Sequence, residues 1–536
     1  MSIIAWRTIN WAQVEFRVKR YQTRIYKASR DNNSYKIRCL QKRLLRSLDA
    51  KLMAIKQVTT LNKVKKIPGV GKKRFTDNEK SKLVQKLRLD GKVLTIKSVY
   101  FGKPEKKDKR LLPGSISVIS NYFVEDRAKQ ALCLLALEPE WEARFESNSY
   151  GFRPGRSCHD AIKSIFINLQ NRSRDKGFYK YILNDNVSKY FNKIDQNYLV
   201  TKLETIPEIE NQVKIWLKKK IFQEYQYTNL NYTWKSIQGL ILSPLLANIV
   251  LHGIENYLKN WVCTKTYFGK TNKYSKNIKF KSLTFIRYAN DFLIIHEEKS
   301  VIQEVKEKIA RWLLKGSYLE ISEAKTSIIN SKEGFDFLGF SIVAITSGPP
   351  RLIIYPSRRS QFTLLSKIQN VIQDNISTSS YNLILKLYPV IIGWANYFRF
   401  SECHKIFHKL THLIYQKIRA WVFRRDTRNG RTKVKQQYFP NGKIYIYEGT
   451  KHKDNWVLTG KQFDKNGIIQ EIWLPHLVWI KSKNWLKIKS SKSPFDSDNI
   501  YWAKRTLNKV NWSIRLCKLI EQNSYYTWCK ILFMEN

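Results

Sequence analysis

Acidic residues are scarce in this sequence, with 43 Asp and Glu against 96 Lys and Arg in 536 residues. A soluble chain with the resulting net charge of +53 repels itself unless an anion neutralises it. A long polyphosphate is the obvious partner, because neutralising it releases condensed counterions. Drift toward AT-rich codons would raise Asn and Ile without sustaining so large an imbalance. The charge therefore indicates a nucleic-acid partner, with an anionic membrane surface as the lesser alternative.

Paired cysteines and long apolar runs are also missing. The seven cysteines are scattered, and no pair has the C-x-x-C spacing of a zinc ribbon. We therefore expect no disulfide framework and a reducing compartment. No apolar stretch reaches the roughly 18 residues that cross a bilayer, and the N-terminus shows no signal-peptide core. These absences argue against a secreted or membrane-spanning protein.

Length and hydrophobic content predict a folded protein of several domains, since 536 residues exceed one core and 43% of them are hydrophobic. Apolar residues at three- and four-residue steps predict basic helices in residues 1–75. Residues 76–345 mix helical patterns with short apolar strands, and residues 360–435 return to helix. Residues 436–536 are rich in Trp, Lys and Asn without a convincing long period.

Two segments place polar residues at the ends of expected strands, YILNDNVSKYFNKID (181–195) and IRYANDFLII (286–295). In the second, apolar runs flank Tyr-Ala-Asn-Asp, as in a β-hairpin. A polymerase needs two Mg²⁺ ions, which require carboxylates converging from neighbouring strands. Because strand side chains alternate, Asn184 and Asn186 would share one face, and Asp185 would lie on the other unless a bulge intervenes. Taken alone, each segment is equally compatible with an ordinary structural turn.

Five sequence blocks occur in a fixed order along the chain. They are LALEPEWEARFE (135–146), SNSYGFRPGRSCHDAI (147–162), QGLILSPLLANI (238–249), FIRYANDFLII (285–295) and ISEAKTSIINSKEGFDFLGF (321–340). Together they resemble the reverse-transcriptase blocks of group II intron-encoded proteins, the reverse transcriptase/maturases. IIGWANYFR (391–399) and KIFHKLTHLIYQKIRAWVFRR (405–425) resemble that family's maturase region, domain X, and SPFDSDNIYWAKR (493–505) resembles the segment after it.

The resemblance implies an α+β, multidomain fold like a right-hand polymerase. A basic helical extension would occupy residues 1–75, with fingers and palm in 76–345 and a helical thumb, domain X, in 360–435. Residues 436–536 would form a DNA-binding-like region with a truncated endonuclease remnant. Many family members end in an HNH endonuclease, whose first Cys-x-x-Cys falls here at Tyr526-Thr527-Trp528-Cys529. One cysteine of that pair is Tyr, so DNA cleavage is not expected.

The resemblance also implies a degenerate palm. The family carries Asp where this chain has Asn186, and its Tyr-Ala-Asp-Asp box reads Tyr288-Ala289-Asn290-Asp291. Asn184 and Asn192 also replace family aspartates. Of three expected carboxylates only Asp291 is retained, so no metal site is expected unless Asp291 holds a residual Mg²⁺. Two lost carboxylates at ~3 kcal/mol each slow the reaction about 10⁴-fold, which predicts little or no DNA synthesis.

Basic residues in three places are expected to contact RNA. Arg110 and Lys325 match basic family positions near the incoming nucleotide, and Arg153 and Arg156 lie in the block 147–162. The helix expected over 404–425 has one apolar face, formed by Ile406, Leu410, Leu413, Ile414, Ile418 and Trp421. Its cations lie mostly elsewhere, namely Lys405, Lys409, Lys417, Arg419, Arg424 and Arg425. The alternative interpretation is a merely solvated amphipathic helix. Trp394 is expected to pack in the thumb core rather than stack on a base.

The leading hypothesis is a maturase that binds group II intron RNA and promotes its splicing. RNA binding would require no cofactor of its own, with Mg²⁺ entering through the RNA. Weak DNA binding and a homodimer remain open, and no membrane is expected as a partner. The alternatives are an active reverse transcriptase that mobilises its intron and a general RNA chaperone. The AT-biased composition favours the plastid stroma, ahead of a mitochondrion or a bacterial cytoplasm.

Overall fold

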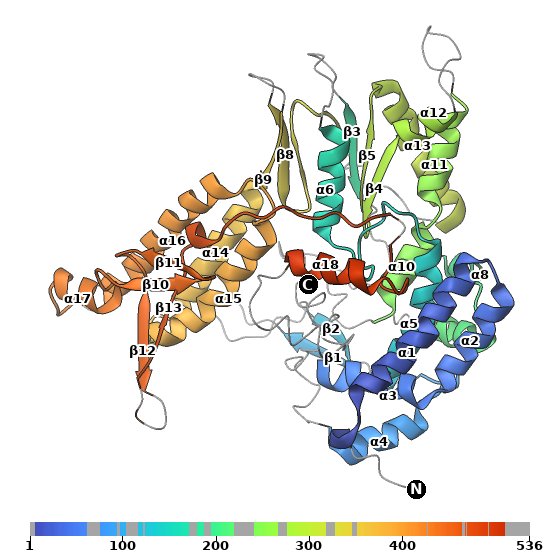
Figure 1. The fold of residues 1–536 in the computed structure, drawn as a ribbon, viewed down its shortest axis with the longest axis horizontal. Helices are drawn as coiled ribbons and strands as arrows, with labels where there is room; N and C mark the ends of the chain where they lie inside the picture. The colour runs from blue at the N-terminus through green and yellow to red at the C-terminus, as the bar shows by residue number, and fades with distance from the viewer. Residues whose placement is uncertain are drawn as a thin grey trace.

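The computed structural model describes most of the chain. The described residues are 6–61, 75–93, 97–102, 116–121, 124–170, 180–186, 195–218, 241–265, 276–317, 327–345, 351–425, 427–463, 467, 469–490 and 492–509. They form a helical N-terminal part, a central part built on a β-sheet, and a second helical part that carries β-hairpins (Figure 1). The predicted α+β class is confirmed. Among the described residues, no helix is long and apolar enough to cross a bilayer.

The N-terminal part consists of α1 (Trp11–Arg30), α2 (Ser34–Arg46) and α3 (Leu48–Lys56), as the periodicity predicts. Each begins after a residue whose side-chain oxygen accepts a hydrogen bond from a first-turn N–H, namely Asn10, Asn33 and Ser47. All three helices pack on the long helix α5 (Val124–Arg144). A capping box of Thr76 and Glu79 starts the next helix, α4 (Asp77–Lys86).

The central sheet has the strand order β4-β5-β3-β6 and is antiparallel throughout. Its strands are β3 (Tyr181–Asn186), β4 (Thr284–Tyr288), β5 (Asp291–His296) and β6 (Ser327–Asn330). Leu183 and Ile294 join a core shared with the N-terminal helices, whereas Ile182 and Leu293 join a core shared with the second helical part. A shift of one residue would exchange these two sets, so burial on both faces fixes the register.

Helices surround this sheet, and a short hairpin lies near the N-terminal part. The hairpin consists of β1 (Lys97–Gly102) and β2 (Ile116–Asn121). The helices are α6 (Cys158–Leu169), α8 (Gln196–Leu203), α9 (Pro207–Lys218), α10 (Ser243–Leu251), α11 (Ile254–Cys263), α12 (Lys276–Ser282) and α13 (Lys299–Ser317). Of these, α6 contacts β4, while α13 contacts β3 and β5.

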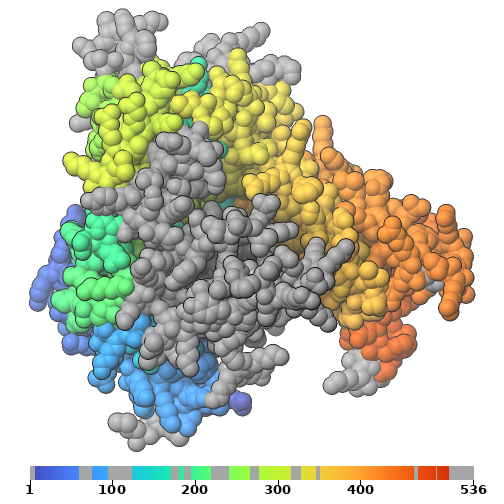
Figure 2. Space-filling view, turned by 180° about the vertical axis from the view of Figure 1, so that it is seen from behind, coloured from blue at the N-terminus to red at the C-terminus, as the bar shows by residue number. Residues whose placement is uncertain are grey.

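The second helical part, predicted as the thumb, contains α14 (Arg358–Gln373), α15 (Ser380–Phe398), α16 (His404–Arg425) and α17 (Arg431–Tyr438). A three-stranded sheet leads into it, formed by β7 (Phe335–Phe337), β8 (Phe340–Ile345) and β9 (Arg351–Pro356). Seen from behind, its gold-to-orange surface projects to one side of the molecule (Figure 2).

Two further hairpins follow the thumb helices. They are β10 (Ile444–Tyr447) with β11 (Thr450–Lys453), and β12 (Thr459–Phe463) with β13 (Ile469–Trp473). The second packs on α15, where Gly460 lies so close that a Cβ atom would sit 2.4 Å from the backbone nitrogen of Tyr381. Strands of four or five residues are too short to show a clear period in the sequence. These two hairpins were therefore not predicted. The four predicted domain boundaries stay predictions.

The C-terminal segment returns to the central part and is fastened there by one buried carboxylate. Asp160, in the first turn of α6, accepts hydrogen bonds at 2.7 and 2.8 Å from Nη2 of Arg505, in α18 (Asn499–Lys509). The same carboxylate accepts from Trp485 Nε1 at 3.0 Å and from the backbone N–H of Ile488 at 2.8 Å. Asp160 and Arg505 are 0% and 1% exposed, so neither charge is compensated by water.

Replacing Asp160 tests this connection. Asp160→Asn leaves the Arg505 guanidinium buried without its counter-charge, which should destabilise the protein by about 3–5 kcal/mol. Chemical denaturation would show this as a lower unfolding midpoint. The matched control is Asp374→Asn, at an exposed position after α14, which should change stability by no more than about 0.5 kcal/mol. Equal midpoints for the two variants would contradict the structural role of Asp160.

Candidate functional site: the palm hairpin and the thumb surface

The hairpin of β4 and β5 has the predicted form. Tyr288 pairs with Asp291 across the strands, which leaves Ala289 and Asn290 as a two-residue loop. Ala289 has a φ of 56°, in the left-handed region that costs a residue with a side chain roughly 1–2 kcal/mol. The loop therefore ends on the Asn290 amide, and β5 begins with the Asp291 carboxylate.

The pairing of β3 with β5 decides which positions face Asp291. Six consecutive pairs run without a bulge from Tyr181 with His296 to Asn186 with Asp291. Residues directly opposite each other in an antiparallel pair lie on the same face, so position 186 belongs beside Asp291. Asp185 pairs with Phe292 and is 3% exposed, on the other face. The predicted placement of Asp185 on the face opposite to that of position 186 is thus confirmed.

The two Mg²⁺ ions of a polymerase require more carboxylates than this edge of the sheet offers. The sequence has Asn at position 186, and among the described residues of the hairpin the loop ends with Asn290 and β5 begins with the Asp291 carboxylate. An amide oxygen can ligate Mg²⁺, but it brings no negative charge. Within the described ranges, no group of three or more His, Cys, Asp and Glu residues is arranged to hold a metal ion. The described residues at this edge of the sheet therefore do not by themselves supply the carboxylates that a pair of Mg²⁺ ions needs.

Three sequence blocks converge behind the hairpin and hold it rigidly. Gly151 lies so close to the loop that a Cβ atom would sit 2.1 Å from the backbone nitrogen of Ala289. Asn248 of α10 donates to the Gly151 carbonyl at 2.9 Å and accepts from Arg287 Nη1 at 3.0 Å. Arg287 also donates to the carbonyl of Ala289 at 3.2 Å. These bracing residues were not predicted from the sequence, although each lies in a block that resembles the family.

Arg153 and Arg156 are used inside the protein. Arg153 is 5% exposed and makes two hydrogen bonds, at 2.7 and 3.0 Å, to the Glu142 carboxylate. Arg156 donates to the carbonyl of Ser147 at 2.7 Å, and burial together with the charge of Arg153 lowers its pKa to about 10. These contacts give both arginines structural roles, so they do not belong to an RNA surface formed by exposed cations. Arg110, Lys325 and Asn192 lie outside the described residues.

Helix α16 has the predicted amphipathic form. Leu410, Ile414, Ile418 and Trp421 are buried, and Ile406 and Leu413 are partly buried. Two further buried residues of the helix, Phe407 and Val422, were not predicted. Trp394 of α15 packs as expected in the thumb core, with ring centroids 4.6 Å from Phe398 and 5.8 Å from Phe407.

The six predicted cations of α16 divide into two groups. Lys405, Lys409, Arg419 and Arg424 are exposed on the side of the helix that faces solvent. Lys417 is half-buried and donates to Gln369 of α14 at 2.8 Å. Arg425 donates to the carbonyls of Ile376 and Ser377 in the turn after α14, each at 3.3 Å. The four exposed cations form a surface that we call the α16 basic face, while the other two also hold α16 to α14.

Comparison with known families matches three regions of the chain. The N-terminal domain of reverse transcriptase matches residues 6–87, and the reverse transcriptase (RNA-dependent DNA polymerase) matches residues 104–342. The maturase-specific domain of group II introns matches residues 363–439. These ranges contain the N-terminal helices, the braced hairpin and the α16 basic face, respectively.

Known proteins resemble the chain over long stretches. Protein YkfC of Escherichia coli is 28% identical over 282 residues, which is 49% of this chain and 70% of that protein. Maturase-like protein 1 of Euglena gracilis is 27% identical over 401 residues, covering 73% and 76%. Group II intron-encoded protein LtrA of Lactococcus lactis is 26% identical over 323 residues, about half of each chain at 51%.

A solved structure of telomerase from Candida albicans matches 63% of the chain at 12% identity, with a TM-score of 0.28 that is too low to carry an argument. The family matches and the ordered sequence blocks both indicate a reverse-transcriptase region followed by a maturase region. The chain has a reverse-transcriptase domain with fingers and palm, followed by a maturase thumb. Its sequence thus carries reverse-transcriptase and group II intron maturase-specific domains, and its relatives include group II intron-encoded and maturase-like proteins.

Proposed function

We propose that this protein is an intron maturase, which binds group II intron RNA and promotes its splicing, and that its palm synthesises no DNA. The observation that carries the second part is the cross-strand pair of Asn186 and Asp291, with Asn290 at the hairpin tip. The first part is supported by the maturase-specific match, which contains a helix with an exposed basic face.

The palm keeps a hairpin of the predicted form, but the sequence has Asn at positions 186 and 290, where the resemblance implies carboxylates. Without carboxylates at positions 186 and 290, bound metal and the developing charge of the transition state lose stabilisation of roughly 3 kcal/mol each, or about 10⁴-fold in rate together. The hairpin nevertheless remains fully braced by Gly151, Asn248 and Arg287. A rigid hairpin without its chemistry fits a domain that is kept as a scaffold for RNA.

Promotion of splicing requires only that the protein binds the active RNA fold more tightly than the inactive ones. Preferential binding shifts the RNA folding equilibrium by that difference in affinity. Folded RNA presents phosphates and 2′-hydroxyls, which exposed lysines and arginines can contact. The protein then needs no cofactor of its own, and Mg²⁺ enters with the RNA.

The proposed compartment is an organelle, and composition and relatives support it. The relatives come from bacteria and from eukaryotes, which fits a gene carried by a bacterium or an organelle. The AT-biased composition and scattered cysteines support an organelle, with the plastid stroma ahead of a mitochondrion. Fractionation of the native host, followed by immunodetection, tests this assignment.

Restoring the palm carboxylates tests the account of the silent polymerase. The double variant Asn186→Asp/Asn290→Asp should extend a primer in the presence of Mg²⁺ or Mn²⁺, and should do so better than either single variant. The physical reason is that three carboxylates would then converge at one edge of the sheet. Primer extension on an RNA template measures it. As a control, adding Asp291→Asn should remove the gained activity. Robust synthesis by the unmodified protein would contradict the proposal.

Reversing charge on the α16 basic face tests RNA binding. The triple variant Lys405→Glu, Lys409→Glu and Arg419→Glu should bind intron RNA more weakly and lose splicing stimulation, since each cation would otherwise contact a phosphate. Losing three such contacts should reduce the slope of log K against log salt by roughly 2. Filter binding across a salt series, together with a splicing assay at near-physiological salt, measures both effects.

The control reverses three exposed cations of α13, at Lys299, Arg311 and Lys315. This variant has the same net charge as the first but an intact α16 basic face. It should stimulate splicing of the intron nearly as well as the unmodified protein does. Equal loss in the two variants would make the effect one of overall charge. If the protein rescued unrelated introns equally well, a general RNA chaperone would replace the maturase.

A further inference from the structure

Trp456 differs from the other tryptophans of the protein. Among the tryptophans in the described residues, it is the one that lies exposed, at 40%. Exposing an indole ring forgoes the large hydrophobic gain of burying it. Trp456 lies in the segment that connects β11 with β12. It was not predicted to pack in a core, and it is not part of the α16 basic face.

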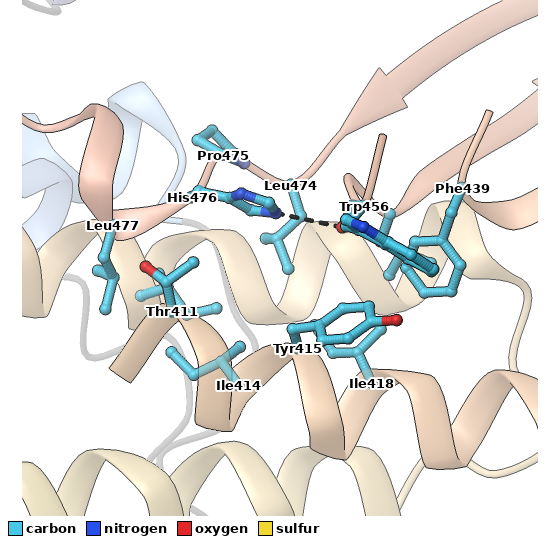
Figure 3. Close-up of a pocket in the computed structure, with 12 residues that line it drawn as sticks. Thr411, Ile414, Tyr415, Ile418, Phe439, Trp456, Leu474, Pro475, His476 and Leu477 are labelled. Atoms are coloured by element: carbon cyan, nitrogen blue, oxygen red, sulfur yellow. Dashed lines mark hydrogen bonds between the residues drawn. The ribbon is translucent and has the colours of Figure 1, made fainter. Parts of the chain in front are cut away.

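The neighbours of Trp456 form an aromatic group on the outer side of α16. Its ring centroid lies 5.2 Å from that of Tyr415 in α16 and 6.3 Å from that of Phe439 (Figure 3). Nζ of Lys435 in α17 sits over the indole, 4.0 Å from the ring centroid. A cation over an exposed ring gains from the ring quadrupole, but only modestly while water remains around it.

The backbone holds this ring in place. The N–H of Trp456 donates to Asp454 Oδ1 at 3.1 Å, and its carbonyl accepts from His476 Nε2 at 3.2 Å (Figure 3). His476 Nδ1 contacts the Asp454 carboxylate at 2.9 Å, which closes the arrangement. The platform is therefore built before a ligand arrives, and binding does not have to order it.

The space beneath the ring is too small for a ligand. The cavity between α16 and the hairpins, lined by Ile414, Leu474 and Leu477 among others, has a volume of about 20 Å³. This accommodates about one water molecule. A ligand can thus use only the outer surface of the aromatic group, where a flat π-system would stack on the indole.

We propose that Trp456 is a stacking platform for one unpaired base of the bound RNA. Lys435 covers the indole in the free protein, and on binding its ammonium turns to the phosphate beside that base. Stacking suits any base because each has a π-face, whereas a base inside a duplex is already stacked and cannot reach the ring. Arg419, one helical turn from Tyr415, connects this site with the α16 basic face. The inference rests on the proposed function and names the feature of the RNA that this face of the thumb recognises.

The test compares single-stranded with paired RNA as probes for the full chain. The probes are a fluorescent adenosine oligonucleotide of about 12 residues, a blunt RNA duplex of equal length, and the DNA form of the single strand. Trp456→Leu should weaken binding of the single-stranded RNA about tenfold, while Trp456→Phe retains most of it. Duplex binding should not change in either variant. The matched control is Phe463→Leu, at an aromatic residue that is 71% exposed and should leave both affinities unchanged.

A second readout identifies the contact directly. Photocrosslinking of the same RNA, with 5-iodouridine in place of one adenosine, should label the peptide that contains Trp456, and Lys435→Met should leave this crosslink in place. Unchanged single-strand affinity in Trp456→Leu would overturn the proposal, and so would equal loss on the duplex. Equal or tighter binding of the DNA strand would overturn the assignment to RNA. If the stacking proposal is wrong but the proposed function is right, reversing the charges of the α16 basic face still weakens RNA binding. If the proposed function fails, that reversal has no effect either.

Discussion

A pair of magnesium ions requires carboxylates that converge from neighbouring strands, and the pairing of β3 with β5 decides which residues can converge. That pairing sets position 186 opposite Asp291. It cannot slip, because a one-residue shift would exchange Ile182 and Leu183 between two cores. Asp185 is therefore held on the wrong face, and the amide at position 186 goes uncompensated. The hairpin keeps its brace, so the proposed loss of DNA synthesis rests on the missing charge and not on a damaged scaffold.

The positively charged side chains fall into two groups, buried and exposed. Arg153 and Arg505 are buried against Glu142 and Asp160, where they connect segments of the fold. Lys405, Lys409 and Arg419 instead face solvent on one helix. With a net charge of +53, a surface of this kind is stabilised by a polyanion rather than by internal partners. An aromatic group next to it adds a means of distinguishing unpaired from paired RNA, which phosphate contacts alone do not provide.

Local patterns revealed much of the fold and part of the site. Alternation predicted the hairpin and the opposite faces of Asp185 and Asn186, and helical periodicity predicted the buried side of α16, because each depends on neighbours within a few residues. The contact of Asp160 with Arg505 spans hundreds of residues, so no local period contains it. The same limit applies to Arg153. Its positive charge suits a contact with RNA, but tertiary packing places it beside Glu142. The exposure of Trp456 likewise depends on which hairpins cover α16, and short strands leave no pattern from which to predict that.

Metal binding at the palm tests the central claim most directly. Electron paramagnetic resonance can follow Mn²⁺ added to the protein with a primer–template and a nucleotide that cannot react. Because one carboxylate faces the site, we expect no spin-coupled pair of ions, and the unmodified protein should resemble an Asp291→Asn variant. A coupled Mn²⁺ pair, with the ions about 4 Å apart and lost in that variant, would show that the palm still assembles a polymerase centre and would contradict the account.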